Sequence, residues 1–232
     1  MDIDEIITNN CKISELLEKN ENLYRTITDG STIKYKDSLI RIPQGYISRV
    51  DDIILKYHLN EIVRNYDVKK NMTYLLQHQD LNRFIYSRFN IWGPVETMTF
   101  KIAQIVYAAF IEALIVEAAK EIWKKCKNCP NKSRECKLFI DKKDAKNMKV
   151  ALEKLSKLGA ITLDDKTCER IKKLYDSRNK IHISLTHKIG NEYTNEMYSP
   201  EDCNNSIELM KLVADDLFNH AVPLYDDLSC RI

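Results

Sequence analysis

The sequence predicts an all-α protein: an up-and-down four-helix bundle with an additional, mostly helical N-terminal region. The chain of 232 residues has only five glycines and five prolines, and its apolar residues recur at helical spacing over long segments. Hydrophobic residues make up 44% and charged residues 30% of the chain, which is typical of a globular protein with a sizeable core. Collagen-like, low-complexity and repeat classes are therefore excluded.

Two domains are expected, with a boundary between residues 66 and 67. The N-terminal region, residues 1–66, should be helical up to about residue 29 and then extended near residues 30–46, where Pro43 and Gly45 interrupt helical periodicity. The other helices are expected at about 48–63 (with Ser48 as N-cap), 68–89, 95–123, 144–158 (with Gly159 as C-cap), 164–185 and 200–221 (with Ser199 as N-cap and Pro200 at the first helical position). The last four form the bundle of residues 67–232.

The expected helix at 95–123 is apolar on nearly all sides, so it should occupy the middle of the bundle. Gln104, Glu112 and Glu117 interrupt its apolar run, which favours a buried bundle helix over a membrane span. The acidic start of the chain, Met1-Asp2-Ile3-Asp4-Glu5, lacks the features of a secretory signal. We therefore expect a cytoplasmic protein with no membrane association.

The helix at 164–185 carries two charged or titratable residues on its apolar face. On a helical wheel of about 100° per residue, Arg178 and His182 fall within the stripe formed by Ile171, Leu174 and Leu185. An arginine and a histidine one turn apart on a core-facing stripe are costly to bury without partners. Their retention at these positions indicates a functional site.

The segment Arg178-Asn179-Lys180-Ile181-His182, late in the third helix of a helical bundle, resembles the motif of HEPN (higher eukaryotes and prokaryotes nucleotide-binding) domains. The resemblance covers roughly residues 95–225 by helix order and motif. Three residues separate Arg178 from His182, a shorter spacing than is usual in the family. The two positions nevertheless face the same way, because residues i and i+4 are neighbours on a helix surface.

The resemblance implies a metal-independent endoribonuclease that needs no cofactor for catalysis and acts as a homodimer on RNA. Its setting would be a toxin–antitoxin or antiviral defence system, with an antitoxin or defence-complex protein as a further partner. The catalytic residues would be Arg178, His182 and Asn179. His182 would move a proton near neutral pH and Arg178 would bind phosphate oxygens, while Asn179 would orient the histidine or contact the phosphate.

A structural interpretation of the same residues stays open. Arg178 is expected to pair with a core acid such as Glu112, which would then be either a second-shell partner of the site or only a counter-charge. In this alternative the chain is a noncatalytic helical module for dimerisation or for binding a nucleotide or partner. A transcription factor with DNA-binding N-terminal helices is the least favoured alternative, since no helix-turn-helix spacing with a glycine turn is visible.

A basic, cysteine-containing loop is expected at residues 126–141. Cys126, Cys129 and Cys136 contain a C-x2-C pair of zinc-knuckle spacing, but a fourth ligand such as Cys168, Cys203 or Cys230 would have to come from elsewhere. A structural zinc ion and reduced surface thiols are both compatible with this pattern.

Basic residues also gather locally, although the net charge is only +2. Residues 120–149 contain eleven basic and four acidic residues. Lys172, Lys173 and Lys180 on the motif helix are the expected RNA-binding residues, since phosphate contacts need only exposed positive charge.

Overall fold

The computed structural model describes residues 3–26, 42, 44–128, 140–179 and 199–226, and these are helices joined by short turns and loops, with no strand among them. The chain divides into two compact units, Met1–Ile42 and Pro43–Ile232. The helices are α1 (Ile3–Thr26), α2 (Val50–Lys56), α3 (Leu59–Ile62), α4 (Tyr66–Arg88), α5 (Pro94–Asn128), the 3₁₀ helix η2 (Asp144–Lys146), α6 (Met148–Leu158), α7 (Asp165–Asn179), α8 (Pro200–His220) and α9 (Val222–Asp226). The all-α class predicted from the sequence is thus confirmed.

The boundary between the units differs from the one expected at residues 66 and 67. Helices α2 and α3 belong to the second unit, where α2 contacts α4, and α3 contacts α5 and α8. Ile53, Leu59 and Ile62 are buried in the same core as Leu114 of α5. Burial of these apolar side chains removes them from water, which explains why the segment joins the second unit.

Among the described residues of the first unit there is one helix, α1, where one or two short helices were expected. Most of its described side chains are exposed, including Ile3, Ile7 and Leu16. Of the extended segment expected near 30–46, residues 30–41 and 43 lie outside the described part of the chain, and residues 44–47 form turns and bends.

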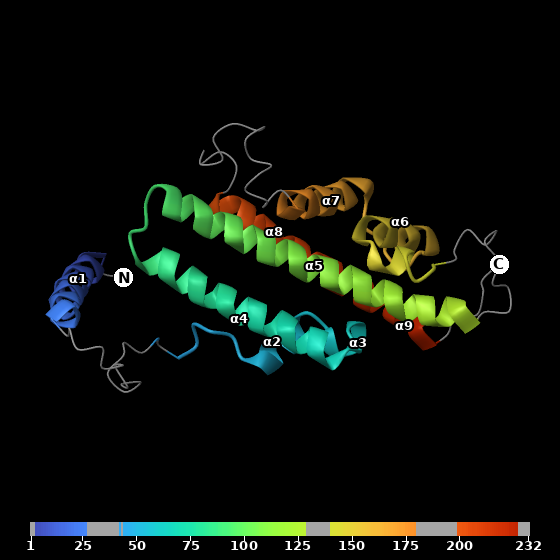
Figure 1. The fold of residues 1–232 in the computed structure, drawn as a ribbon, viewed down its shortest axis with the longest axis horizontal. Coiled ribbons are helices and arrows are strands. Elements are labelled where there is room, and N and C mark those ends of the chain that lie inside the picture. The colour runs from blue at the N-terminus through green and yellow to red at the C-terminus, as the bar shows by residue number, and fades with distance from the viewer. Residues whose placement is uncertain (1–2, 27–41, 43, 129–139, 180–198, 227–232) are drawn as a thin grey trace. The chain divides into compact units, whose positions relative to one another are not determined.

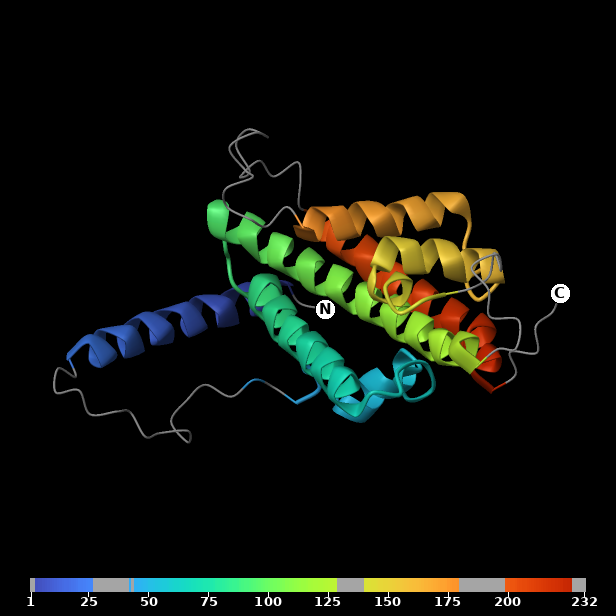
Figure 2. The same ribbon diagram turned by 45° about the vertical axis from the view of Figure 1, so that its right-hand side comes forward.

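Helix α5 is the axis of the second unit. Figures 1 and 2 show α4 along one side of α5, α6 and α7 along another, and α8 beside it in both views. The side chains of Phe110, Leu114, Ile115 and Ile122 have no exposed surface. The prediction that this helix lies in the middle is confirmed.

The sequence signals for helix ends are largely confirmed. The side chain of Ser199 accepts a hydrogen bond from the Asp202 N–H, and the Asp202 carboxylate accepts one from the Ser199 N–H. These two bonds form a capping box at the start of α8. Gly159 ends α6 in the left-handed conformation, at a φ of 74°, which glycine adopts without strain.

Two expected helices differ in detail. The segment at 48–63 is divided into α2 and α3 because His58 lies in the left-handed region, at a φ of 51°, and Arg49 rather than Ser48 is the N-cap. The segment at 144–158 begins with η2, and Asn147 caps α6 by accepting from the Val150 N–H at 3.3 Å. Helix α7 is described to Asn179, so the expected continuation to Leu185 lies outside the described residues.

The acidic residues of α5 are accommodated by neighbouring cations. Buried Glu117 pairs with Lys120 at 2.5 Å, and buried Glu121 pairs with Lys124 at 2.5 Å. By length and composition α5 would also suffice to cross a membrane, because a window within Val95–Asn128 reaches a mean hydropathy of 1.8, but 61% of that window is buried. One such helix is weak evidence for a span, since a core helix has the same composition.

Candidate functional site

Helix α7 places Arg178 at the end of an apolar stripe. Ile171 and Leu174 are 1% and 9% exposed and pack into the core, with Tyr175 beside them. Arg178 follows Leu174 by four residues, so it lies on the same face one turn later. Its side chain is 33% exposed, because the stripe leaves the core toward the C-terminal end of α7. The arginine is therefore half-buried, rather than buried in the core as expected.

The Arg178 guanidinium forms an ion pair with the Glu112 carboxylate of α5, through Nη1 and Oε2. The Glu112 side chain is 25% exposed, so both charges keep some contact with water. This is the pairing expected from the sequence. A guanidinium has five N–H donors in a planar fork, so one held through Nη1 can still offer other donors to an anion.

The remaining residues of the motif are described only in part. Asn179 is the last residue of α7, and its backbone places it directly after Arg178. Lys180 and His182 lie outside the described residues. The catalytic roles expected for these residues stay predictions.

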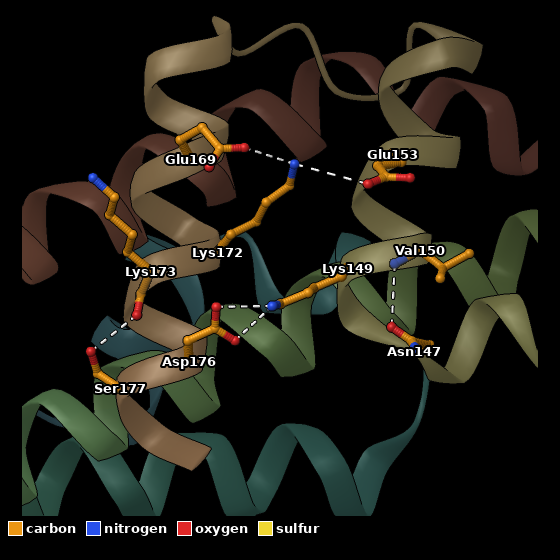
Figure 3. A network of polar contacts seen from close by, with 9 residues as sticks. All are labelled: Asn147, Lys149, Val150, Glu153, Glu169, Lys172, Lys173, Asp176 and Ser177. Atoms are coloured by element: carbon orange, nitrogen blue, oxygen red, sulfur yellow. Dashed lines mark hydrogen bonds and ion pairs between the residues drawn. The ribbon is translucent and has the colours of Figure 1, made fainter. Parts of the chain in front are cut away.

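A network of ion pairs links α6 to α7 on the side shown in Figure 3. Lys149 of α6 contacts the Asp176 carboxylate at 2.6 Å and 2.9 Å. Lys172 of α7 contacts Glu169 at 2.9 Å and Glu153 of α6 at 3.9 Å. The hydrogen bond between Lys172 and Glu169 raises the pKa of the lysine and lowers the pKa of the carboxyl. This network was not predicted from the sequence; it links α6 to the helix that carries Arg178.

The network bears on the lysines expected to bind RNA. The charge of Lys172 is engaged by two carboxylates, so an RNA phosphate would have to compete with them. Lys173 is exposed, and its backbone carbonyl accepts a hydrogen bond from Ser177 at 3.0 Å. Of the two described lysines, Lys173 is therefore better suited to contact phosphate.

Of the three cysteines expected to hold zinc, the structure describes one. Cys126 lies near the end of α5 and is 6% exposed, whereas Cys129 and Cys136 lie outside the described residues. Cys203, a candidate fourth ligand, is 1% exposed; burial raises the pKa of its thiol to about 12, and the thiol donates a hydrogen bond to the Phe100 carbonyl at 3.7 Å. Within the described ranges, no cluster of three or more histidine, cysteine or acidic residues could hold a metal ion.

Comparison with known proteins adds no family. No protein-family model matches the chain, and neither a curated protein nor a solved structure matches it.

Proposed function

We propose that the chain is a metal-independent endoribonuclease of HEPN type, in which Arg178 and His182 act on the scissile phosphate of RNA. The observation that supports this proposal is the Arg178 ion pair with Glu112 at a partly exposed edge of the helical core. A guanidinium fixed there, and still in contact with water, is suited to receive a phosphodiester. Glu112 would act as a positioning residue that orients the guanidinium.

The proposed reaction uses the nucleophile that RNA carries. One group removes the proton of the 2′-hydroxyl, whose oxygen forms a bond to phosphorus, while the bond from phosphorus to the 5′-oxygen breaks and that oxygen takes up a proton. The products are a 2′,3′-cyclic phosphate and a 5′-hydroxyl. His182 would transfer a proton at one of these two oxygens, and Arg178 would stabilise the charge that develops on the phosphorane.

The proposal extends to the architecture and the partners. Helices α5, α6, α7 and α8 would be the four helices of a HEPN-like bundle, since α6, α7 and α8 each contact α5. Two copies would meet at their motif helices to build a shared cleft for RNA. An antitoxin or defence-complex protein would be a further partner, and the setting would be the cytoplasm.

The test is cleavage of a mixed pool of tRNA and unstructured RNA in EDTA, with mapping of the product ends. We expect cyclic-phosphate ends from the wild-type protein and a loss of at least about a hundredfold in rate for His182→Ala and for Arg178→Ala. Arg170→Ala is the matched control, because Arg170 is an exposed arginine of the same helix. Unchanged cleavage in both motif variants would overturn the proposal.

The ion pair itself also favours a second candidate, a noncatalytic module for dimerisation or partner binding. Because the Glu112 carboxylate pairs with the Arg178 guanidinium, each residue neutralises the charge of the other, and their presence can be explained without a substrate. This candidate predicts no turnover of any RNA in the pool. It also predicts that Arg178→Met lowers the melting temperature, because the Glu112 carboxylate loses its partner, whereas Arg170→Met does not.

A further inference from the structure

A second polar site lies between α2, α4, α5 and α8. An open groove of about 530 Å³ is lined by Gly45, Tyr46 and Ser48, by the C-terminal part of α4 and by Pro200 and Asn204 of α8. An inner cavity of about 50 Å³ lies next to it. Ser48, Asp80 and Arg83 line both spaces, so the groove and the cavity adjoin each other.

The inner cavity contains buried polar groups that have no hydrogen-bond partner among the described residues. Gln79 is 2% exposed, and both its amide nitrogen and its amide oxygen lack a partner. Tyr107 is also 2% exposed, and its hydroxyl lacks a partner in the same part of the chain. Both residues line the cavity. Such groups are costly to bury unless something satisfies them, and a cavity of this volume has room for a small polar group.

The charge around the groove and the cavity favours an anion. Lys56, Arg83 and Arg88 contribute positive charge, and of the described residues that line the two spaces Asp80 alone is acidic. The Asp80 carboxylate already accepts a hydrogen bond from the Ser48 N–H at 2.8 Å. Arg83 lines both spaces, so its guanidinium can meet an anion that enters from the groove, and its charge offsets that of Asp80.

The donors inside the cavity fit an oxyanion. Burial raises the pKa of Tyr57 to about 12 and also raises the pKa of Tyr107, although the nearby charge of Arg83 lowers both. Both hydroxyls consequently stay protonated near neutral pH and remain hydrogen-bond donors. The Gln79 NH₂ group is a further donor. The oxygens of a carboxylate or of an ionised phosphate can accept hydrogen bonds from these donors.

The open groove has aromatic walls. The rings of Tyr46 and Phe84 pack edge to face with centroids 4.8 Å apart, and Arg88 donates to the Tyr46 hydroxyl at 3.0 Å. Tyr86 lines the same groove. The first turn of α8, whose N-terminus carries positive partial charge, supplies Pro200 and Asn204. The groove therefore offers aromatic surface against which a planar or apolar ligand body can pack.

We propose that this groove binds a small organic anion with a planar body, whose carboxylate or phosphate is received by Arg83, Gln79 and Tyr107. The inference is independent of the proposed ribonuclease activity, because Arg178 and Glu112 line neither the groove nor the cavity. A carboxylate and a phosphate present the same acceptor chemistry, and experiment distinguishes them.

The first experiment uses four probes that differ in one group: phenyl phosphate, benzoate, phenol and inorganic phosphate. The readouts are the melting temperature of the full chain and the NMR shift of the Gln79 side-chain amide, with each probe at millimolar concentration. We expect phenyl phosphate or benzoate to raise the melting temperature and to shift the amide, with phenol at least tenfold weaker. Inorganic phosphate alone should bind more weakly than phenyl phosphate, since it lacks the planar body. If neither phenyl phosphate nor benzoate binds, the proposal is wrong.

The second experiment assigns the site. Gln79→Leu should weaken binding of the better probe at least tenfold and leave the melting temperature of the free protein unchanged or higher, because it removes an unpaired amide. Gln104→Leu is the matched control: the Gln104 side chain is 8% exposed, its amide nitrogen also lacks a partner among the described residues, and it does not line the groove or the cavity. Arg83→Met should abolish the preference for an anion over phenol. Equal weakening by the Gln79 and Gln104 variants would contradict the assignment, and Tyr107→Phe provides the same test if Gln79→Leu fails to fold.

Discussion

Asp216 of α8 and Gln79 of α4 are both polar and both buried, but their surroundings differ completely. The Asp216 carboxylate accepts hydrogen bonds from the Thr162 N–H at 3.0 Å and from the Thr162 hydroxyl at 2.6 Å. The Gln79 amide, among the described residues, has no partner at all. A buried polar group with partners holds the fold together, whereas one without partners costs stability and indicates a place for something else to bind.

The largest effect is expected when the satisfied group is removed. Asp216→Ala leaves the Thr162 N–H without its acceptor and deletes two hydrogen bonds to a charged group. The free energy of unfolding should fall by about 2–4 kcal/mol in urea denaturation. Thr162→Val is the control, because it removes the hydroxyl bond alone and should cost about 1 kcal/mol. A loss below about 1 kcal/mol for Asp216→Ala would mean that its bonds add little to stability.

Alkaline pH tests the tyrosines beside Gln79. Burial raises the pKa of Tyr57 to about 12, so between pH 10 and 12 the hydroxyl ionises in the unfolded chain but not in the folded one. Stability from this group is complete below pH 10 and is lost as pH rises to 12, by about 2–3 kcal/mol. Tyr57→Phe should remove this part of the decline in urea denaturations at pH 8 to 12. An identical decline in wild type and variant would show that the Tyr57 pKa is not raised.

The ion pair between Arg178 and Glu112 is intermediate between the hydrogen-bonded Asp216 carboxylate and the unpartnered Gln79 amide. Both side chains are partly exposed, so a double-mutant cycle of Arg178→Met and Glu112→Gln should give a coupling energy of about 1 kcal/mol. The coupling should shrink in 1 M salt, because exposed charges are screened. A coupling energy of several kcal/mol that does not depend on salt would contradict this expectation and show that the pair is a buried structural contact like that of Asp216.

The smallest expected effect is an increase in the free energy of unfolding, where the other variants lower it. Tyr107→Phe removes a buried hydroxyl that has no partner in the described part of the chain. The free energy of unfolding should rise by about 0.5–1 kcal/mol in the absence of ligand. A decrease of that size would show that the hydroxyl is already satisfied, and the contrast with Asp216 would then disappear.

Much of the fold could be predicted from the sequence, because it depends on local signals. The start of α8 at Ser199 and Pro200 and the end of α6 at Gly159 follow from short-range hydrogen bonding and backbone geometry. The division of α2 from α3 could not be predicted, since a histidine in the left-handed region has no sequence signature. The placement of α2 and α3 in the second unit depends on packing against distant helices.

For the candidate sites too, the sequence predicts local features but not the contacts between distant helices. The apolar stripe of α7 led to Arg178, and its pairing with Glu112 was anticipated, yet the stripe alone could not show that Arg178 lies where it reaches the surface. The stripe of α4 carries a comparable signal, because Gln79 follows Met72 and Leu76 at helical spacing and all three are buried. A helical wheel of α4 therefore predicts a polar side chain on its buried face at Gln79. Whether the Gln79 amide has a hydrogen-bond partner depends instead on the packing of other helices around it.

The position of α5 has a consequence for biosynthesis. Helices α6, α7 and α8, which contact α5, all follow it in the chain. At about 5–20 residues per second, a ribosome needs on the order of 5–20 s to make the roughly hundred residues between the end of α5 and the end of α9. During that interval α5, whose apolar surface these helices cover in the folded protein, still lacks part of its packing partners. Until α8 is complete, the uncovered apolar surface is available to chaperones and to other nascent chains.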